Sequence, residues 1–330
     1  MIETKVTIRC EYLFFAILAG IAKLRMKSMR QSKFQTTILP IMGAVFLTLG
    51  IVGCSEDPEV DSNTVDKEVL DLDGSLNSVF DGKIFSIPSP IQTAYLIQDL
   101  DLSFDDSMLN DHQNVSNYIS EYTQALNLGV YGADLGYVSI YEEKGAAMSY
   151  LTSIKKLTSE LGLESAFDSN FISRFEDNSE DQDSMVQLMS DAFSKADNFL
   201  KKSDRKSVSA LVLAGGWVES LYFSSELNNK KSSEKMLRRI GEQKETLKTL
   251  IDLLTEYNDE GKNDDLIVDL KDLMVSFEKI DLQYEYEAPE TLEKKKLTKL
   301  THRLTVKVSD SVLAEIRTKI TSIRNNIIKA

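Results

Sequence analysis

Apolar side chains recur at steps of three and four residues along most of the chain beyond residue 90, a spacing typical of the buried face of an α-helix. Preferred capping residues precede several of these stretches, such as Asn263 and Asp264, or Ser309 and Asp310. The pattern predicts an all-α fold, a multi-helix bundle of about eight or nine helices. The expected helices cover residues 91–96, 115–141, 146–163, 167–175, 185–200, 207–227, 236–257, 266–280 and 312–328.

Two short segments depart from the helical period. In residues 282–287 and 303–308, apolar and polar side chains alternate, as they do along a half-buried strand. Two interpretations stay open: the segments pair as one short β-hairpin near residues 282–308, or the flanking helices continue through both. In the hairpin, the acidic outward face of one strand meets the basic outward face of the other, which contributes a few tenths of a kcal/mol to about 1 kcal/mol.

The chain before the helices contains an ordered succession of charge, apolar residues and a cysteine. Two basic residues, Arg30 and Lys33, precede an apolar run at 38–53, and Cys54 follows at once. Residues 51–54, Ile-Val-Gly-Cys, resemble the lipobox of bacterial lipoprotein signal peptides. The resemblance implies that the cysteine thiol is lipidated and the leader is cleaved. A transmembrane anchor is the alternative, but the run is shorter than the roughly 20 residues that span a bilayer.

These features divide the chain into three expected regions. Residues 1–53 form a leader, of which 1–28 read as a mis-assigned start before a signal peptide at 29–53 that begins at Met29 or Met26. Residues 54–85 form an acidic lipid-anchored tether, and residues 86–330 form a single helical domain. The acids within 55–59 resemble the surface-export signal of Bacteroidota lipoproteins. That resemblance implies attachment to the outer membrane, facing the periplasm or the cell surface.

The charge balance narrows the possible partners. The leader holds seven of the 38 Lys and Arg residues and two of the 52 acids, so the mature chain has 31 bases, 50 acids and a net charge of −19. A surface this acidic repels phosphate backbones, and nucleic acid is therefore not expected as a partner. The expected partners are the membrane, through a lipid on Cys54, and an envelope protein or small ligand of unspecified identity.

One predicted helix carries a polar stripe opposite a glycine stripe. At about 100° per residue, Asn127, Tyr131, Asp134 and Tyr141 fall within one narrow arc, and Gly129, Gly132 and Gly136 fall on the other side. Three interior glycines cost roughly 0.5 to 1 kcal/mol each in helix propensity. We therefore expect another helix backbone to approach them closely. The polar arc is either a binding surface or a hydrogen-bonded network inside the bundle.

A second predicted helix, residues 207–227, is apolar on nearly all sides and includes Gly215, Gly216, Trp217 and Glu219. A helix of this kind is central, so Glu219 needs a partner or a raised pKa, and Glu219→Gln should be mild if the acid is neutral. Two interpretations stay open. Trp217 and Glu219 form a pocket floor facing the stripe of Asn127 and Asp134, or they are a core aromatic and a neutralised acid.

The two helices, NLGVYGADLGY and LVLAGGWVES, resemble a pattern of uncharacterised all-helical envelope lipoproteins of Bacteroidota, which implies an all-α domain and no known activity. Sequence patterns of zinc sites, phosphate loops, nucleotide-binding loops and nucleophile elbows do not occur, so we expect no metal and no cofactor. A non-enzymatic binding or scaffold module is therefore favoured. The alternative is a hydrolase in which Asp134 and Glu219 serve as acid and base.

Overall fold

The computed structural model describes residues 4–9, 76–80, 83–87, 102–164, 170–178, 182–286, 290–292 and 297–329. Cys54, the segment 10–75 and the helix expected at 91–96 lie outside these residues. Among the helices described, none has the length and apolar character needed to span a membrane.

The chain divides into two units, and all the described helices belong to the first. The second unit contains, among described residues, most of strand β1 (Thr4–Arg9), strand β5 (Glu290–Leu292) and the first part of β6 (Leu297–Lys307). Within it β5 pairs antiparallel with β6, with Glu290 opposite Lys299.

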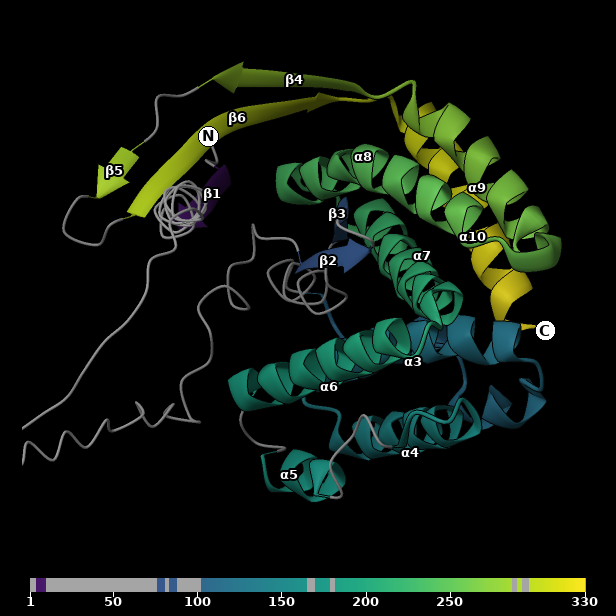
Figure 1. Cartoon of the computed structure of the whole chain (residues 1–330). Helices are drawn as coiled ribbons and strands as arrows, with labels where there is room; N and C mark the ends of the chain where they lie inside the picture. The colour runs from purple at the N-terminus through teal and green to yellow at the C-terminus, as the bar shows by residue number, and fades with distance from the viewer. Residues whose placement is uncertain are drawn as a thin grey trace, which may run out of the picture. The chain divides into compact units, whose positions relative to one another are not determined.

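The first unit is the predicted all-α bundle, shown in Figure 1. Helices α3 and α7 form its most extensive pair; α4 packs on α3, α8 on α7, α9 on α8, and α10 on both α7 and α9. Its α-helices are α3 (Glu121–Ile140), α4 (Lys144–Glu160), α5 (Phe171–Asp177), α6 (Gln182–Lys202), α7 (Lys206–Lys230), α8 (Glu234–Glu256), α9 (Asp264–Phe277) and α10 (Asp310–Ile328). Three short 3-10 helices are η1 (Asp106–Met108), η2 (His112–Asn117) and η4 (Asp259–Gly261).

Cap residues explain several of these boundaries. Ser120, Ser233 and Ser309 each accept a hydrogen bond from the backbone N–H three residues later, at the starts of α3, α8 and α10. Asn263 occupies the predicted cap position of α9, but its side chain donates instead to carbonyl oxygens at the end of α8. It thereby joins two consecutive helices.

The crossing of α3 and α7 confirms the close helix approach predicted from the glycines. A Cβ atom on Gly129 would lie 2.0 Å from the carbonyl oxygen of Val212, and one on Gly215 would lie 1.9 Å from that of Leu126. Neither backbone can move away without displacing its whole helix. Gly132 differs, because a Cβ there would meet the end of the Phe193 ring, at 2.1 Å, and not a backbone. The backbone contact therefore explains Gly129 but not Gly132.

Of the two interpretations left open for residues 282–308, the structure has the β-hairpin. Strand β4 (Asp281–Tyr286) pairs antiparallel with β6, and Asp281 stands opposite Lys307 while Glu285 stands opposite Arg303. The acidic face of one strand thus meets the basic face of the other, as expected. Leu282 and Val306 of the hairpin lie within about 3 Å of where a Cβ on Gly241 of α8 would stand.

A second hairpin occupies residues that the sequence analysis assigns to the tether and the start of the domain. Strand β2 (Leu76–Phe80) pairs with β3 (Lys83–Ile87), and the pairing of Phe80 with Lys83 leaves two residues between the strands. Those residues are Asp and Gly, a strong signal for a two-residue hairpin turn. The turn signal contradicts the assignment of residues up to 85 to an extended tether.

Candidate functional site

A buried ion pair lies where α7 meets α10. Glu219 is 0% exposed and Arg324 is 5% exposed. The Arg324 guanidinium donates to both carboxylate oxygens of Glu219, with Nε at 2.9 Å from Oε2 and Nη2 at 2.9 Å from Oε1. It also donates to the carbonyl oxygen of Met108 at 3.0 Å, and its Cζ atom lies over the Tyr222 ring, 4.6 Å from the ring centre. Glu219 therefore has the partner that its burial requires.

Asp134 of α3 is the third ionisable group of this site and is 0% exposed. Neither of its carboxylate oxygens has a hydrogen-bond partner, although Glu219 and Asn110 are near enough to affect its protonation. Burial raises the pKa of Asp134 well above its ordinary value, and the Glu219 charge raises it further. Burial also raises the pKa of Glu219, but Arg324 opposes that rise. The arrangement fits an ionised Glu219 beside a neutral, protonated Asp134.

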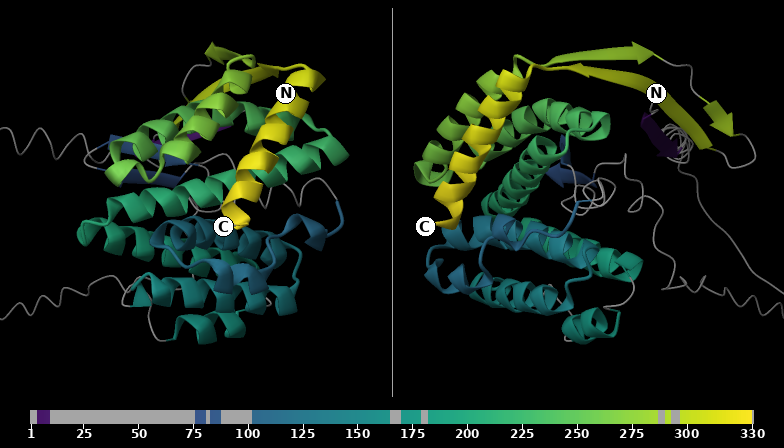
Figure 2. Two further views of the ribbon diagram at one scale, coloured as in Figure 1. Left: turned by 90° about the vertical axis from the view of Figure 1, so that its right-hand side faces the viewer. Right: turned by 180° about the vertical axis from the view of Figure 1, so that it is seen from behind.

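The end of α10 is held by side chains of the polar stripe and of the loop before α3. Asn127, which is fully buried, donates to the carbonyl oxygen of Ile327 at 3.1 Å, and Tyr118 donates to that of Ile328 at 3.2 Å. The last carbonyl groups of a helix lack partners within the helix, so these two side chains satisfy them. Figure 2 shows this end of α10 beside the early part of the bundle.

Asn110 connects the loop to the same cluster. The side-chain amide of Asn110 donates to the Tyr118 hydroxyl at 3.0 Å and to the side-chain oxygen of Asn127 at 3.3 Å. The backbone carbonyl oxygen of Asn110 accepts from the Tyr150 hydroxyl at 2.9 Å. Tyr131 donates to the carbonyl oxygen of Asp111 at 2.9 Å. We call the group of Asn110, Tyr118, Asn127, Tyr131, Asp134, Tyr150, Glu219 and Arg324 the polar cluster.

The structure brings together four of the six residues proposed from sequence and separates the other two. Trp217 is buried on the opposite side of α7, where its indole donates to Gln243 of α8 at 2.9 Å. Residues two positions apart on a helix point about 200° apart, so Trp217 and Glu219 cannot face the same neighbour. Tyr141 packs against Phe104 and Tyr137 at the far end of α3, outside the polar cluster.

Arg324 is the residue that the sequence analysis missed, although a signal for it exists. It follows Ile320 by four residues and precedes Ile327 by three, so it falls on the apolar face of α10. A basic residue on a buried helix face requires an acid, and Glu219 is a buried acid without an assigned partner. Asn110 lies in an irregular segment where no periodicity identifies buried positions. Tyr118 lies before α3, which begins at Glu121 and not at residue 115 as expected.

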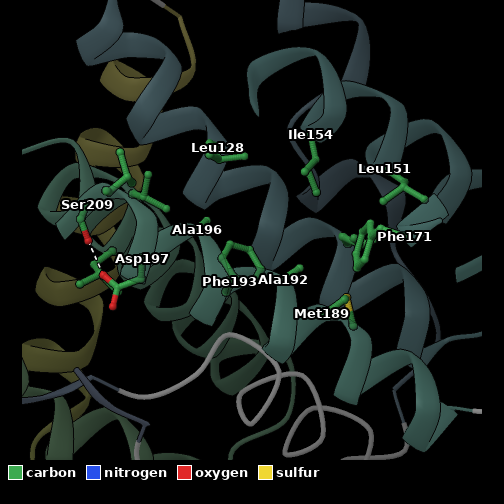
Figure 3. Close-up of a pocket in the computed structure, with 14 residues that line it drawn as sticks. Leu128, Leu151, Ile154, Phe171, Met189, Ala192, Phe193, Ala196, Asp197 and Ser209 are labelled. Atoms are coloured by element: carbon green, nitrogen blue, oxygen red, sulfur yellow. Dashed lines mark hydrogen bonds between the residues drawn. The ribbon is translucent and has the colours of Figure 1, made fainter. Parts of the chain in front are cut away.

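Two cavities among the described residues lie apart from the polar cluster. One, of about 80 Å³, is lined mostly by apolar side chains of α3, α4, α5, α6 and α7 and is shown in Figure 3. The other, of about 120 Å³, lies near Glu142, Lys144 and Met185. Within the described part of the chain, no group of three His, Cys, Asp or Glu residues could hold a metal ion. No family model, curated protein or solved structure matches this chain.

Proposed function

We propose that the chain is a lipid-anchored protein of the cell envelope whose helical domain is a non-enzymatic binding or scaffold module. The anchor rests on the order of bases, apolar run and Cys54 within residues 29–54. The acids after Cys54 support a place on the outer membrane, facing the periplasm or the cell surface. The resemblance to Bacteroidota envelope lipoproteins agrees with this assignment.

One observation supports the non-enzymatic function most directly: Asp134 and Glu219 are both 0% exposed. An acid and a base that act on a substrate must reach it by a direct contact or through one water molecule. Here Arg324 donates hydrogen bonds to both carboxylate oxygens of Glu219. Neither the Asp134 nor the Glu219 carboxyl group lines either of the two cavities described above. The pair therefore stabilises the junction of α3, α7 and α10.

The hydrolase alternative has one favourable observation, the raised pKa of Asp134. A catalytic acid requires a raised pKa, but burial next to Glu219 produces the same shift in a structural carboxyl group. If the two groups act on a substrate, α10 must first separate from α7 to expose them. The alternative thus depends on an opening of the bundle at this junction.

Metabolic labelling with a tagged palmitate tests the anchor. We expect wild-type protein to incorporate the label and Cys54→Ala to incorporate none. Equal labelling of the two proteins would contradict the anchor. Protease treatment of intact cells separates the two orientations, since digestion places the domain at the cell surface and protection excludes that placement.

Crosslinking on intact cells tests the binding module. We expect wild type and Asp134→Asn to recover the same partner, because Asp134 is in the core and touches no ligand. Loss of a measurable hydrolytic activity in Asp134→Asn, with the fold unchanged, would instead favour the hydrolase.

A further inference from the structure

The cavity of about 120 Å³ lies at the turn that joins α3 to α4. Its apolar wall includes Met148 of α4 and Met185 of α6. Its polar wall comes from the end of α3 and from the turn, and consists of Ser139, Glu142, Glu143 and Lys144. The volume is about four-fifths of the roughly 150 Å³ of a cavity that takes up benzene, so a ligand of about four or five non-hydrogen atoms matches it in size.

The Ser139 hydroxyl is the unusual group of the polar wall. Ser139 is 6% exposed, and its Oγ atom has no hydrogen-bond partner in the described part of the chain. By contrast, three buried serines of α7 each donate to the carbonyl oxygen four residues earlier, namely Ser220, Ser224 and Ser225. A buried polar group without a protein partner is expected to bond to a bound molecule. The Ser139 hydroxyl therefore indicates a ligand in the cavity that it lines.

Two carboxylates give this wall its charge. Glu142 and Glu143 follow Ser139 by three and four residues, and their backbone N–H groups hold the turn by donating to carbonyl oxygens at the end of α3. Both residues are exposed, and neither side chain makes a hydrogen bond or an ion pair with the described residues. Lys144 supplies one opposing charge, and the adjoining ends of α3 and α4 supply opposed dipoles that largely cancel. The polar wall is therefore net negative and favours a cation.

We propose that this cavity binds a primary ammonium group on a short alkyl stem. An ammonium has three N–H donors, and the polar wall offers three acceptors for them, the Ser139 hydroxyl and the carboxylates of Glu142 and Glu143. The stem, of about three or four carbons, packs against Met148 and Met185. The proposal rests on the binding function proposed above and names the ligand class of that function.

Propylamine is the probe, and the protein is the full chain with Cys54→Ser, so that no lipid is attached. Methionine-methyl NMR follows the titration, because Met148 and Met185 line the cavity whereas Met236 is buried on α8 and does not line it. We expect saturable shifts of the Met148 and Met185 signals, with a dissociation constant of about 1 to 10 mM for a ligand of this size, and no shift of the Met236 signal. Propionate and 1-propanol, which are similar in size, should bind at least about fivefold more weakly.

Ser139→Ala separates binding from folding. It removes a buried hydroxyl that has no protein partner, so the melting temperature should stay unchanged or rise, while propylamine binding weakens at least about fivefold. Ser225→Ala is the control, because it removes a hydroxyl that bonds within α7 and should leave propylamine binding unchanged.

Glu142 allows a second comparison, because its backbone has a φ of 58°, in the region that favours glycine. Glu142→Gly should therefore leave the melting temperature unchanged or raise it, while it weakens propylamine binding about two- to fivefold. Glu260 is also an exposed acid with a positive φ, of 56°. Glu260→Gly should change the melting temperature in the same direction and leave propylamine binding unchanged.

Three results would overturn the proposal: no saturable shift of the Met148 and Met185 signals, propionate or 1-propanol bound as tightly as propylamine, or equal propylamine binding by wild type, Ser139→Ala and Glu142→Gly. A cavity that holds only water gives the first of these results. Recovery of a protein partner by crosslinking in the same case would leave the binding module standing, with its ligand elsewhere.

Discussion

The ion pair of Glu219 and Arg324 should be strongly coupled in a double-mutant cycle. The guanidinium makes three hydrogen bonds to the carboxylate, and the side chains are 0% and 7% exposed. Removing one partner of a buried pair leaves an uncompensated charge and costs about 3 to 5 kcal/mol. We therefore expect that loss in the free energy of unfolding for Glu219→Gln and again for Arg324→Met, contrary to the mild effect of Glu219→Gln expected from sequence.

The double variant Glu219→Gln/Arg324→Met removes both charges, so its loss should be smaller than the sum of the single losses by at least about 2 kcal/mol. Urea unfolding at neutral pH measures each value. The chain supplies a matched control, because Arg205 and Glu121 form an Arg–Glu contact at 2.7 Å with the side chains 28% and 61% exposed. Their cycle should give a coupling below about 1 kcal/mol. Equal coupling in the two cycles would refute the buried ion pair.

Three further predictions concern Asp134, the crossing of α3 and α7, and Trp217. The folded-state pKa of Asp134 lies above its ordinary value of 3.8, so the contribution of this group to stability is full below about pH 4 and falls as pH rises toward the folded pKa. Relative to wild type, Asp134→Asn should therefore gain stability as pH increases, by up to about 1.4 kcal/mol per pH unit in urea unfolding. A pH-independent difference would contradict a neutral Asp134. Gly129→Ala should lower stability by about 1 to 3 kcal/mol or more, because its Cβ meets the backbone of α7, whereas Gly145→Ala, which has open space around it, should be neutral or slightly stabilising in the same denaturation assay. Trp217, the sole tryptophan, is 2% exposed, so its fluorescence should resist iodide quenching until the protein unfolds, and quenching in the native state would place the indole at the surface.

Much of the fold was predictable because helical periodicity is a local property of the sequence. The starts of α8 and α10 lie within two residues of the expected starts, and the two hairpin strands coincide with segments in which apolar and polar residues alternate. The close approach of α3 and α7 was also predictable, since interior glycines are costly in a helix unless another backbone lies against them, as one does at Gly129 and at Gly215. These arguments need only the pattern of each segment.

The polar cluster was only partly predictable because its partners come from distant segments. Asn127, Tyr131 and Asp134 share a face by helix geometry, but Arg324 is 105 residues from Glu219 along the chain. The ion pair of Glu219 and Arg324 can be predicted only if α10 is known to pack on α7, and no local sequence pattern predicts that packing. The placement of Trp217 was different. Helix geometry alone separates it from Glu219, so the pocket-floor interpretation could have been rejected from sequence.

The most direct test of the proposed function is the intact mass of the protein extracted from the cell envelope. Our proposal predicts a chain that starts at Cys54, lacks residues 1–53 and carries the added mass of a diacylglycerol-modified cysteine, and it predicts that Cys54→Ala retains its leader. A wild-type chain with an unmodified Cys54 and an intact leader would contradict the lipid anchor.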